Sequence, residues 1–228
     1  MGQRSLSIVP RAIPALLVLA LALQVAWQRW SPPPPAATVL LEAPPALALL
    51  RLSALGEPIA LSRVLMFHVQ GADQGRGYGK LDYDNLEQWL TRISDLDPRA
   101  QYPLRAASHV YAAVGDPAKK RQMLEFIHQR FWLDPEHRWP SMAYAAIAAK
   151  HELHDLPLAR RYASAIRRQA SGPGVPDWAR QMEIFILEDM NQIESAKILL
   201  GGLIASGQVS DPQERRFLLE RLRQMEKR

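Results

Sequence analysis

The sequence of 228 residues contains no cysteine, which excludes disulfides, thiolate zinc sites, iron–sulfur clusters and cysteine nucleophiles. It also lacks any segment in which β-branched and polar residues alternate strictly, the pattern of a half-buried strand. Gly-x-Ser-x-Gly, Ser-x-x-Lys and glycine-rich phosphate loops between a strand and a helix are absent too. We therefore expect an all-α protein that is not an enzyme and that holds no cofactor or metal.

Acidic residues are missing from the first 30 positions, whereas Arg4, Arg11 and Arg29 lie there. These three arginines account for much of the formal net charge of +5. Without them the chain has 25 basic and 23 acidic residues, of the 28 and 23 in the whole sequence. Because the body carries almost no net positive charge, we expect it to bind no nucleic acid.

Residues 12–26 contain no charge and one polar side chain, Gln24. This apolar run is shorter than the roughly 17–25 residues that cross a bilayer, but flanking tryptophans and a snorkelling arginine lengthen it. We therefore predict a transmembrane anchor over residues 12–30. The side chains expected at the membrane interface are Arg11, Trp27, Arg29 and Trp30.

The positive charge ahead of the anchor predicts the orientation of the chain. Residues 1–11 are expected in the cytoplasm and the body in the periplasm, with the anchor in a bacterial inner membrane. The alternative is a cleaved signal peptide, for which Ala20-Leu21-Ala22 offers a cleavage site. We favour the anchor because Trp27 and Trp30 lie beyond that site, where an aromatic belt is expected.

After the anchor, residues 31–43 form a linker in which four consecutive prolines predict a short polyproline rod. Residues 44–82 are expected to form a helical hairpin followed by a glycine-rich loop, and residues 83–228 a helical repeat domain. Apolar residues at helical spacing, separated by Gly and Asp-Pro signals, predict the individual helices. The predicted ranges are 45–54, 58–69, 83–96, 102–114, 117–132, 139–153, 157–170, 176–190, 193–206 and 211–226.

A repeat is visible in these helices. Leu96-Asp97-Pro98 recurs as Leu133-Asp134-Pro135, and Tyr102-Pro103 recurs as Trp139-Pro140, both 37 residues later. A helical hairpin repeated at this period cannot bury its apolar side alone and must stack on its neighbours. Residues 142–149 are apolar and small on all sides, which predicts a central helix, whereas residues 183–189 predict an exposed face.

The helix pairs resemble tetratricopeptide repeats, through the aromatics Tyr102, Trp139 and Trp178, the small residues Ala118, Ala159 and Ala196, and the Asp-Pro closures. The Leu-Gly pair of that family is missing from the first helix of each repeat. The chain is also similar to uncharacterised bacterial proteins that join a membrane segment to a helical-repeat domain. The resemblance covers residues 83–206 and implies a solenoid of helical hairpins. In the last helix, Phe217, Leu218, Leu222 and Met225 are expected to cap the stack.

Two groups of side chains are candidate binding residues. Two Arg-Arg pairs seven residues apart lie on one side of a predicted helix and form a candidate ridge for an anion or an acidic partner, unless they are simply solvated. The ridge consists of Arg160, Arg161, Arg167 and Arg168. Large aromatics around one turn are candidate interface anchors, although they equally suit the core between hairpins. These aromatics are Phe131, Trp132 and Trp139.

Two neighbouring histidines, His151 and His154, are three residues apart rather than the four of the His-Glu-x-x-His metal motif. Surface histidines at a helix end explain them, and we expect no metal. The function expected from the whole sequence is a membrane-anchored scaffold that binds protein partners. The alternatives are a periplasmic carrier or chaperone with an apolar groove for a hydrophobic or lipid ligand, and a periplasmic enzyme with a buried polar cluster.

Overall fold

The computed structural model describes residues 12–30, 41–72, 77–207, 209 and 211–227. The chain divides into two compact units, Met1–Val39 and Leu40–Arg228. The first unit contains α1 (Ala12–Trp30), a helix of 19 residues. Within the described residues, no single helix has both the length and the hydropathy needed to cross a membrane. One pair of helices, Leu47–Ser53 with Pro58–Gly71, meets both criteria when the two are taken together, but the pair is bent by 113°.

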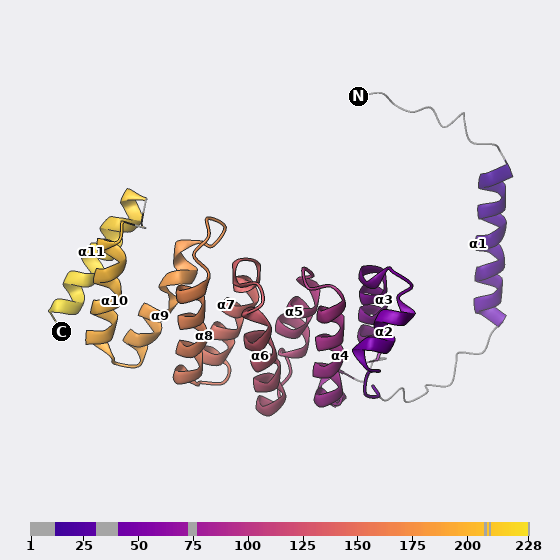
Figure 1. Ribbon diagram of the computed structural model, residues 1–228, viewed down its shortest axis with the longest axis horizontal. Helices are drawn as coiled ribbons and strands as arrows, with labels where there is room; N and C mark the ends of the chain where they lie inside the picture. The colour runs from indigo at the N-terminus through magenta and orange to yellow at the C-terminus, as the bar shows by residue number, and fades with distance from the viewer. Residues whose placement is uncertain (1–11, 31–40, 73–76, 208, 210, 228) are drawn as a thin grey trace, which may run out of the picture. The chain divides into compact units, whose positions relative to one another are not determined.

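The second unit is built of helices, and the described part of the chain contains no strand (Figure 1). The all-α prediction is therefore confirmed, and the predicted helices are present with most ends close to those expected. The α-helices are α2 (Leu47–Ser53), α3 (Pro58–Gly71), α4 (Tyr83–Leu96), α5 (Tyr102–Ala106), α6 (Pro117–Phe131), α7 (Pro135–His151), α8 (Leu156–Gln169), α9 (Asp177–Asp189), α10 (Ile193–Ala205) and α11 (Pro212–Glu226). A 3-10 turn, η2 (Tyr78–Lys80), precedes α4, and a π-helical turn, η3 (Ala107–Tyr111), continues α5.

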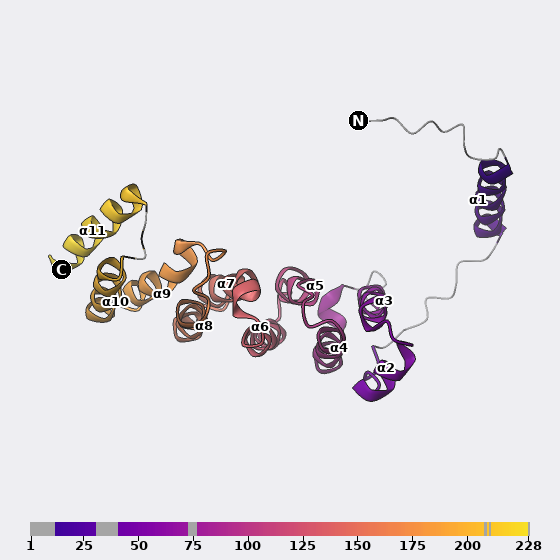
Figure 2. The same ribbon diagram turned by 45° about the horizontal axis from the view of Figure 1, so that its top comes forward.

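The helices of the second unit alternate between two layers. Figure 2 shows α3, α5, α7 and α9 in one layer and α4, α6, α8 and α10 in the other. From α3 to α11, helices that are consecutive in the chain pack on each other, with η3 linking α5 to α6, and α4 also touches α6, as α5 touches α7. Helix α2 instead packs on α4.

Aspartate caps explain why several of these helices begin where they do. The side chains of Asp82, Asp116, Asp155 and Asp211 accept hydrogen bonds from backbone N–H groups in the first turn of α4, α6, α8 and α11. In the last three of these helices a proline follows in the first turn. Backbone N–H groups in the first turn have no acceptor within the helix, so the absence of an N–H in proline costs no hydrogen bond there. These caps are the Asp and Pro signals that the sequence offers as helix starts.

Helix α7 differs from the prediction because it begins at Pro135 instead of residue 139. An interior proline breaks helices in general, since it removes one hydrogen bond and crowds the preceding turn. Pro140 lies so near the start of α7 that the lost bond concerns only the carbonyl of residue 136, in the first turn. The helix therefore continues through Pro140, whose side chain is exposed.

Arg138 in α7 connects the Leu96-Asp97-Pro98 turn with the last turn of α6. Its side chain is buried and donates hydrogen bonds to the carbonyl oxygens of Arg130 and, at 2.6 Å, of Pro98. Burial lowers the pKa of Arg138, and the charge of Arg130 lowers it further. The turn that follows α4 and the last turn of α6 are thus connected by one buried guanidinium.

The core lies between the two layers, with α7 at its centre. This helix contacts α5, η3, α6 and α8, which confirms the prediction of a central helix. The buried residues of its small apolar segment are Met142, Ala143, Ala145, Ala146, Ala148 and Ala149. Side chains without branches or bulk allow the neighbouring helices to approach α7 closely on several sides.

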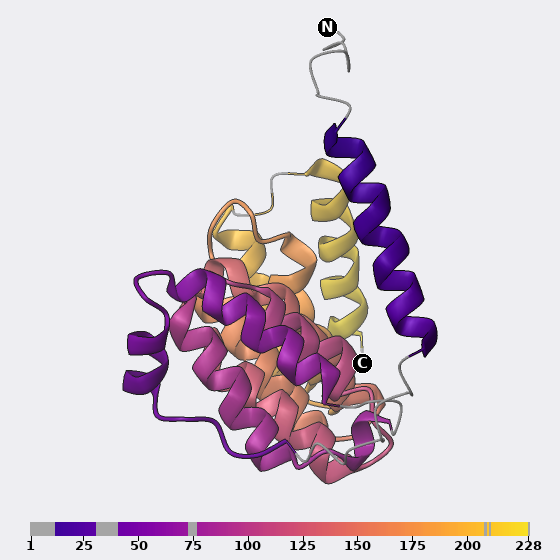
Figure 3. The same ribbon diagram turned by 90° about the vertical axis from the view of Figure 1, so that its right-hand side faces the viewer.

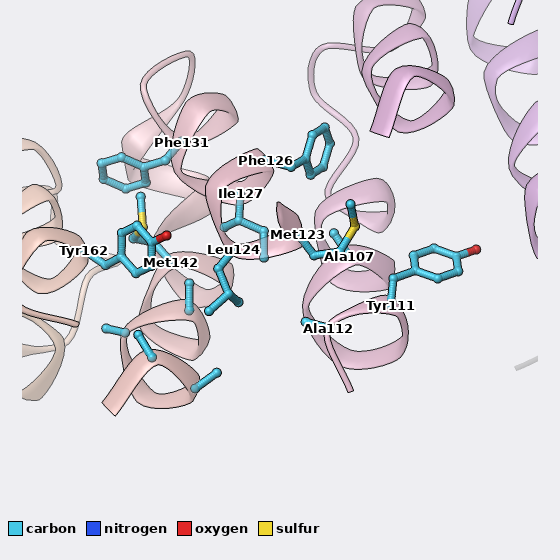
Figure 4. Close-up of a cluster of buried hydrophobic side chains, with 14 of the residues drawn as sticks. Ala107, Tyr111, Ala112, Met123, Leu124, Phe126, Ile127, Phe131, Met142 and Tyr162 are labelled. Carbon is cyan, nitrogen blue, oxygen red and sulfur yellow. The ribbon is translucent and has the colours of Figure 1, made fainter. Parts of the chain in front are cut away.

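Helix α6 contributes to the core on two sides. Figure 4 shows Phe131 near Met142 and Tyr162 on one side of α6, and Met123 near Tyr111 of η3 on the other. All five side chains are buried. The second helix of one hairpin thus fills the space toward the hairpins before and after it.

Two predictions about exposure are wrong. Residues 183–189 were expected on an exposed face, but α9 packs between α8 and α10 and buries Glu183, Ile184, Ile186 and Leu187, and only Asp189 of this segment is exposed. Phe217 was expected to cap the stack, but it is 55% exposed, and Leu218 and Met225 are the buried residues of α11.

Candidate functional site

The four arginines of the predicted ridge all lie on α8, but they do not share one free surface. Arg160 and Arg167 face α9, where both pair with Glu183. Arg161 faces α6 and pairs with Glu125. Arg168 is exposed, and the structure gives it no ion pair among the described residues. Three of the four guanidinium groups therefore have ion-pair partners within the second unit, two of them sharing one carboxylate.

Glu183 is the polar residue that sequence reasoning missed. It is 2% exposed, and its carboxylate lies 3.6 Å from Nε of Arg160 and accepts a hydrogen bond of 2.7 Å from Nε of Arg167. A buried carboxylate requires such partners, because the loss of hydration must be compensated by nearby positive charge. The signal in the sequence is the seven-residue spacing of the two arginines, which places both on the side of α8 that faces α9.

Similar polar contacts connect the outer sides of α4, α6 and α8. We call the surface formed by these outer sides the charged face. Gln122 of α6 donates hydrogen bonds to Asp84 and Glu87 of α4, at 2.8 and 2.9 Å. Further pairs across these elements are Arg130 with Asp95, Arg121 with Asp155, and Arg161 with Glu125. The charges of this face are matched from one helix to the next.

The charged face includes two groups with shifted pKa values. Burial raises the pKa of Tyr162 to about 12, although the charge of Arg161 opposes this shift. The Tyr162 hydroxyl donates a hydrogen bond to Glu125 at 3.0 Å. Burial lowers the pKa of His128, whose ring packs against Tyr162 and Trp132 at centroid distances of 5.3 and 5.7 Å. Tyr162 and His128 are therefore both held neutral beside charged neighbours.

The three predicted interface aromatics have different environments. Phe131 is fully buried in the core between α6 and α7. Trp132 follows it at the end of α6, is 48% exposed and packs edge-on against His128. Trp139 lies on α7 and contacts Trp178 of α9, with 5.6 Å between ring centroids. Phe131 and Trp132 touch each other, but the structure pairs Trp139 with a different tryptophan.

A second surface runs across η3, α7 and α9, in the layer opposite the charged face. His109 of η3 packs edge-on against Tyr144 of α7, with 4.7 Å between centroids, and Trp139 packs in the same way on Trp178. Ile147 is 46% exposed, and Trp178 is 50% exposed. We call this surface the aromatic face and define it as His109, Trp139, Tyr144, Ile147 and Trp178. Large apolar and aromatic side chains kept partly in water are typical of surfaces that bind another protein.

The sequence reasoning identified Trp139 both as a candidate interface aromatic and as a repeat marker, and Trp178 only as a repeat marker. It missed Tyr144 and Ile147 because residues 142–149 of α7 are apolar on every side, so the pattern does not separate a core side from an outer side. The spacing that marks the outer side is Pro140, Tyr144 and Ile147, at i, i+4 and i+7. Tyr102, the third aromatic of the repeat, instead shares a hydrogen bond of 2.7 Å with the Ser62 hydroxyl.

The two histidines near the end of α7 lie on exposed positions. His151 is the last residue of the helix, and His154 lies in the following turn with a positive φ of 51°. Between them, Glu152 forms an ion pair with Lys120 of α6. Over the described ranges, no group of three or more His, Asp and Glu side chains is placed to hold a metal ion.

The predicted membrane-interface residues belong to the first unit and its margins. Trp27 is 75% exposed, and Arg29 lies in the last turn of α1 and is exposed too. Arg11 lies outside the described residues. Trp30 is the last residue of α1, and its side chain lies outside what the structure describes.

Comparison of the chain with models of protein families, with curated proteins and with solved structures finds no match.

Proposed function

We propose that this protein is a membrane-anchored scaffold whose helical unit binds a protein partner through the aromatic face. In this proposal residues 12–30 hold the chain in a bacterial inner membrane, with the N-terminus in the cytoplasm and the second unit in the periplasm. The helical hairpins form a solenoid similar to tetratricopeptide repeats, and the protein carries out no catalysis.

One observation supports this function above the others: aromatic and aliphatic side chains from three elements of one layer remain at least partly exposed, and two pairs of rings among them are in contact. Burial of such side chains stabilises a complex by about 25 cal/mol for each Å² of apolar surface removed from water. Paired rings such as Trp139 with Trp178 are already ordered, so that a partner orders little further on binding. The opposite layer offers mainly charges that already have partners.

The arginine ridge is not the surface we propose for the partner. Arg160 and Arg167 stabilise the carboxylate of Glu183, so changing them to glutamate would disturb the packing of α8 on α9. A role of the ridge in binding is therefore tested with Arg168→Glu alone, which leaves these ion pairs intact.

A photo-crosslinking amino acid placed at single positions of the full chain in membranes tests the proposal. At Ile147, on the aromatic face, we expect a discrete crosslink to a protein partner. The matched control is Gln129, an exposed position on α6 in the other layer, where we expect none. Trp178→Ala should weaken the crosslink from Ile147, because the substitution removes half of the tryptophan pair elsewhere on the same face.

Equal crosslinking from both positions, or none from either, would contradict the proposal. A crosslink from Ile147 to lipid rather than to protein would instead favour a carrier of hydrophobic molecules.

A further inference from the structure

Helices α2 and α3 expose an unusual amount of apolar surface. Leu52 is 74% exposed and Leu55 is 91% exposed, in and just after α2. On α3, Val64 is 62% exposed and Phe67 is 74% exposed. Figure 3 views the second unit from the end at which these two helices lie. Large apolar side chains left in water on two consecutive helices indicate a surface that binds an apolar surface or a membrane.

The apolar side chains of α3 form two separate stripes. Ser62, Met66 and Val69 are buried and face the rest of the second unit, where α3 packs on α4. The outer stripe is formed by residues at i, i+4, i+7 and i+11, namely Ala60, Val64, Phe67 and Gly71, all of them exposed. The outer stripe therefore has no function in the packing of α3 on α4.

Cationic side chains flank this outer surface. Arg51 of α2 and Arg63 of α3 are exposed, and Glu57, between the helices, is the only carboxylate in residues 44–71. Arg63 also lines a hollow of about 310 Å³ together with Phe67 and Tyr102. An apolar stripe bordered by arginines is the pattern of a helix that lies in the interface of an anionic bilayer.

The lengths of the helices exclude a single straight span and agree with this position. Taken together, α2 and α3 have the length and hydropathy of a membrane segment, but they are bent by 113°. Neither helix alone reaches the roughly 30 Å of the hydrocarbon core, since α3 has 14 residues and α2 has 7. Bent apolar helices of this size fit the surface of a bilayer better than its interior.

The order of the chain favours lipid over other occupants of this surface. The ten residues 31–40 separate the described ends of α1 and the second unit, and a segment of that length spans at most about 35 Å. Under the proposed function residues 12–30 lie in the bilayer. Among the helices of the second unit, α2 and α3 are then tethered nearest to it.

We propose that the outer surface of α2 and α3 docks on the headgroup region of an anionic membrane. Leu52, Leu55, Val64 and Phe67 enter the boundary between headgroups and acyl chains, while Arg51 and Arg63 contact lipid phosphates. The inference rests on the proposed membrane anchor and goes beyond it, because it orients the first helices of the second unit on the bilayer. The aromatic face is then presented by a unit that is held at two points.

The absence of cysteine makes a site-specific test straightforward. Phe67→Cys or Val64→Cys in the full chain carries one environment-sensitive fluorophore. The matched control is Ile198→Cys on α10, because Ile198 is 74% exposed, as Phe67 is. The labelled proteins are reconstituted in vesicles of phosphatidylcholine and phosphatidylglycerol in equal parts, with and without nitroxide-labelled lipid.

Labels at Phe67 and Val64 should lie about 5–10 Å deep in the boundary region, so their emission shifts to the blue and nitroxide lipid quenches it. The label at Ile198 should be quenched no more than free dye. In a chain labelled at Phe67, Leu52→Glu together with Leu55→Glu should reduce the quenching, because buried carboxylates lose hydration.

Each other outcome overturns the docking and identifies the cause. If the chain floats with the vesicles but the label at Phe67 is not quenched, the anchor functions and α2 and α3 stand away from the membrane. If the label becomes shielded only as the protein-to-lipid ratio rises, a second copy of the chain covers the surface. If the chain does not float, both the anchor and the docking fail. Failure of the Ile147 crosslink leaves the docking result unchanged.

Discussion

The charged face and the aromatic face belong to opposite layers of the second unit, and they use their exposed side chains differently. On the charged face, cations and carboxylates of neighbouring helices are paired, as Arg161 is with Glu125 and Arg121 with Asp155. On the aromatic face, the exposed groups are rings that touch each other in pairs and the aliphatic side chain of Ile147.

This difference indicates what each layer contributes. An exposed ion pair contributes only about 0.2–1 kcal/mol to stability, but a series of pairs fixes which helix lies beside which. Aromatic side chains left in water contribute little to folding and gain free energy when a partner covers them. We therefore expect substitutions near the charged face to change stability and substitutions on the aromatic face to change binding.

The largest effect expected from this comparison concerns Glu183. Glu183→Gln replaces the buried carboxylate with a neutral amide, so Arg160 and Arg167 lose their shared counter-charge. We expect the free energy of unfolding to fall by about 2 kcal/mol, the range measured for hydrogen bonds to charged groups. Urea denaturation followed by circular dichroism measures the change.

Glu194→Gln is the matched control for this substitution. Glu194 also pairs with a cation, Lys197, but it is 83% exposed, and we expect a change within about 0.5 kcal/mol. Equal losses in the two variants would mean that burial of the carboxylate on α9 adds nothing to its ion pairs.

A smaller effect is expected where the turn between α8 and α9 positions Trp178. The carboxylate of Glu136, in the first turn of α7, accepts hydrogen bonds from the backbone N–H of Ser171 at 2.9 Å and of Gly172 at 2.8 Å. A Cβ at position 172 would overlap this carboxylate. Gly172→Ala should therefore break these bonds and reduce stability by about 1–2 kcal/mol, measured by denaturation.

Gly174→Ala provides the comparison within the same turn, because a Cβ there meets no atom within 4 Å. We expect it to be neutral, or to stabilise by up to about 0.5 kcal/mol through the reduced freedom of the unfolded chain. If Gly172→Ala also weakens crosslinking from Ile147, the turn controls the aromatic face. If both alanine variants behave alike, Glu136 does not hold the turn.

Local signals in the sequence predicted the helices well, because Asp116, Asp155 and Asp211 with their following prolines mark helix starts through bonds within one turn. The start of α7 was predicted too late. A proline breaks a helix only when it lies well beyond the first turn, so the effect of Pro140 could not be judged before the start of α7 was known. The all-α fold could thus be predicted from short-range chemistry.

The positions of the candidate site residues could not be predicted in the same way, because they depend on contacts between helices. The arginines of α8 are on one helix in the sequence, but only the neighbours α6 and α9 decide which of them is neutralised. Glu183 looked solvent-exposed because the pattern of α9 does not reveal that α8 and α10 cover it. Ile147 and Tyr144 were hidden for the opposite reason, since every side of α7 is apolar.

The smallest effect concerns His128, a member of the charged face whose protonated form is disfavoured by burial. Its ring lies against Tyr162 and Trp132, and its Nδ1 is 3.9 Å from a carboxylate oxygen of Glu125. Because burial lowers its pKa below the usual 6.5, the unfolded chain takes up a proton at a higher pH than the folded protein does. The folded protein should therefore lose stability as the pH falls below that value.

The measurement compares the free energy of unfolding of the natural chain and of His128→Gln between about pH 7.5 and about pH 5. The natural chain should lose more stability over this interval, because glutamine does not titrate. His151→Gln, at an exposed position, should follow the natural chain. If instead His128→Gln loses more stability than the natural chain, Glu125 stabilises a charged His128, and the charge pairing of this face extends to the histidine as well.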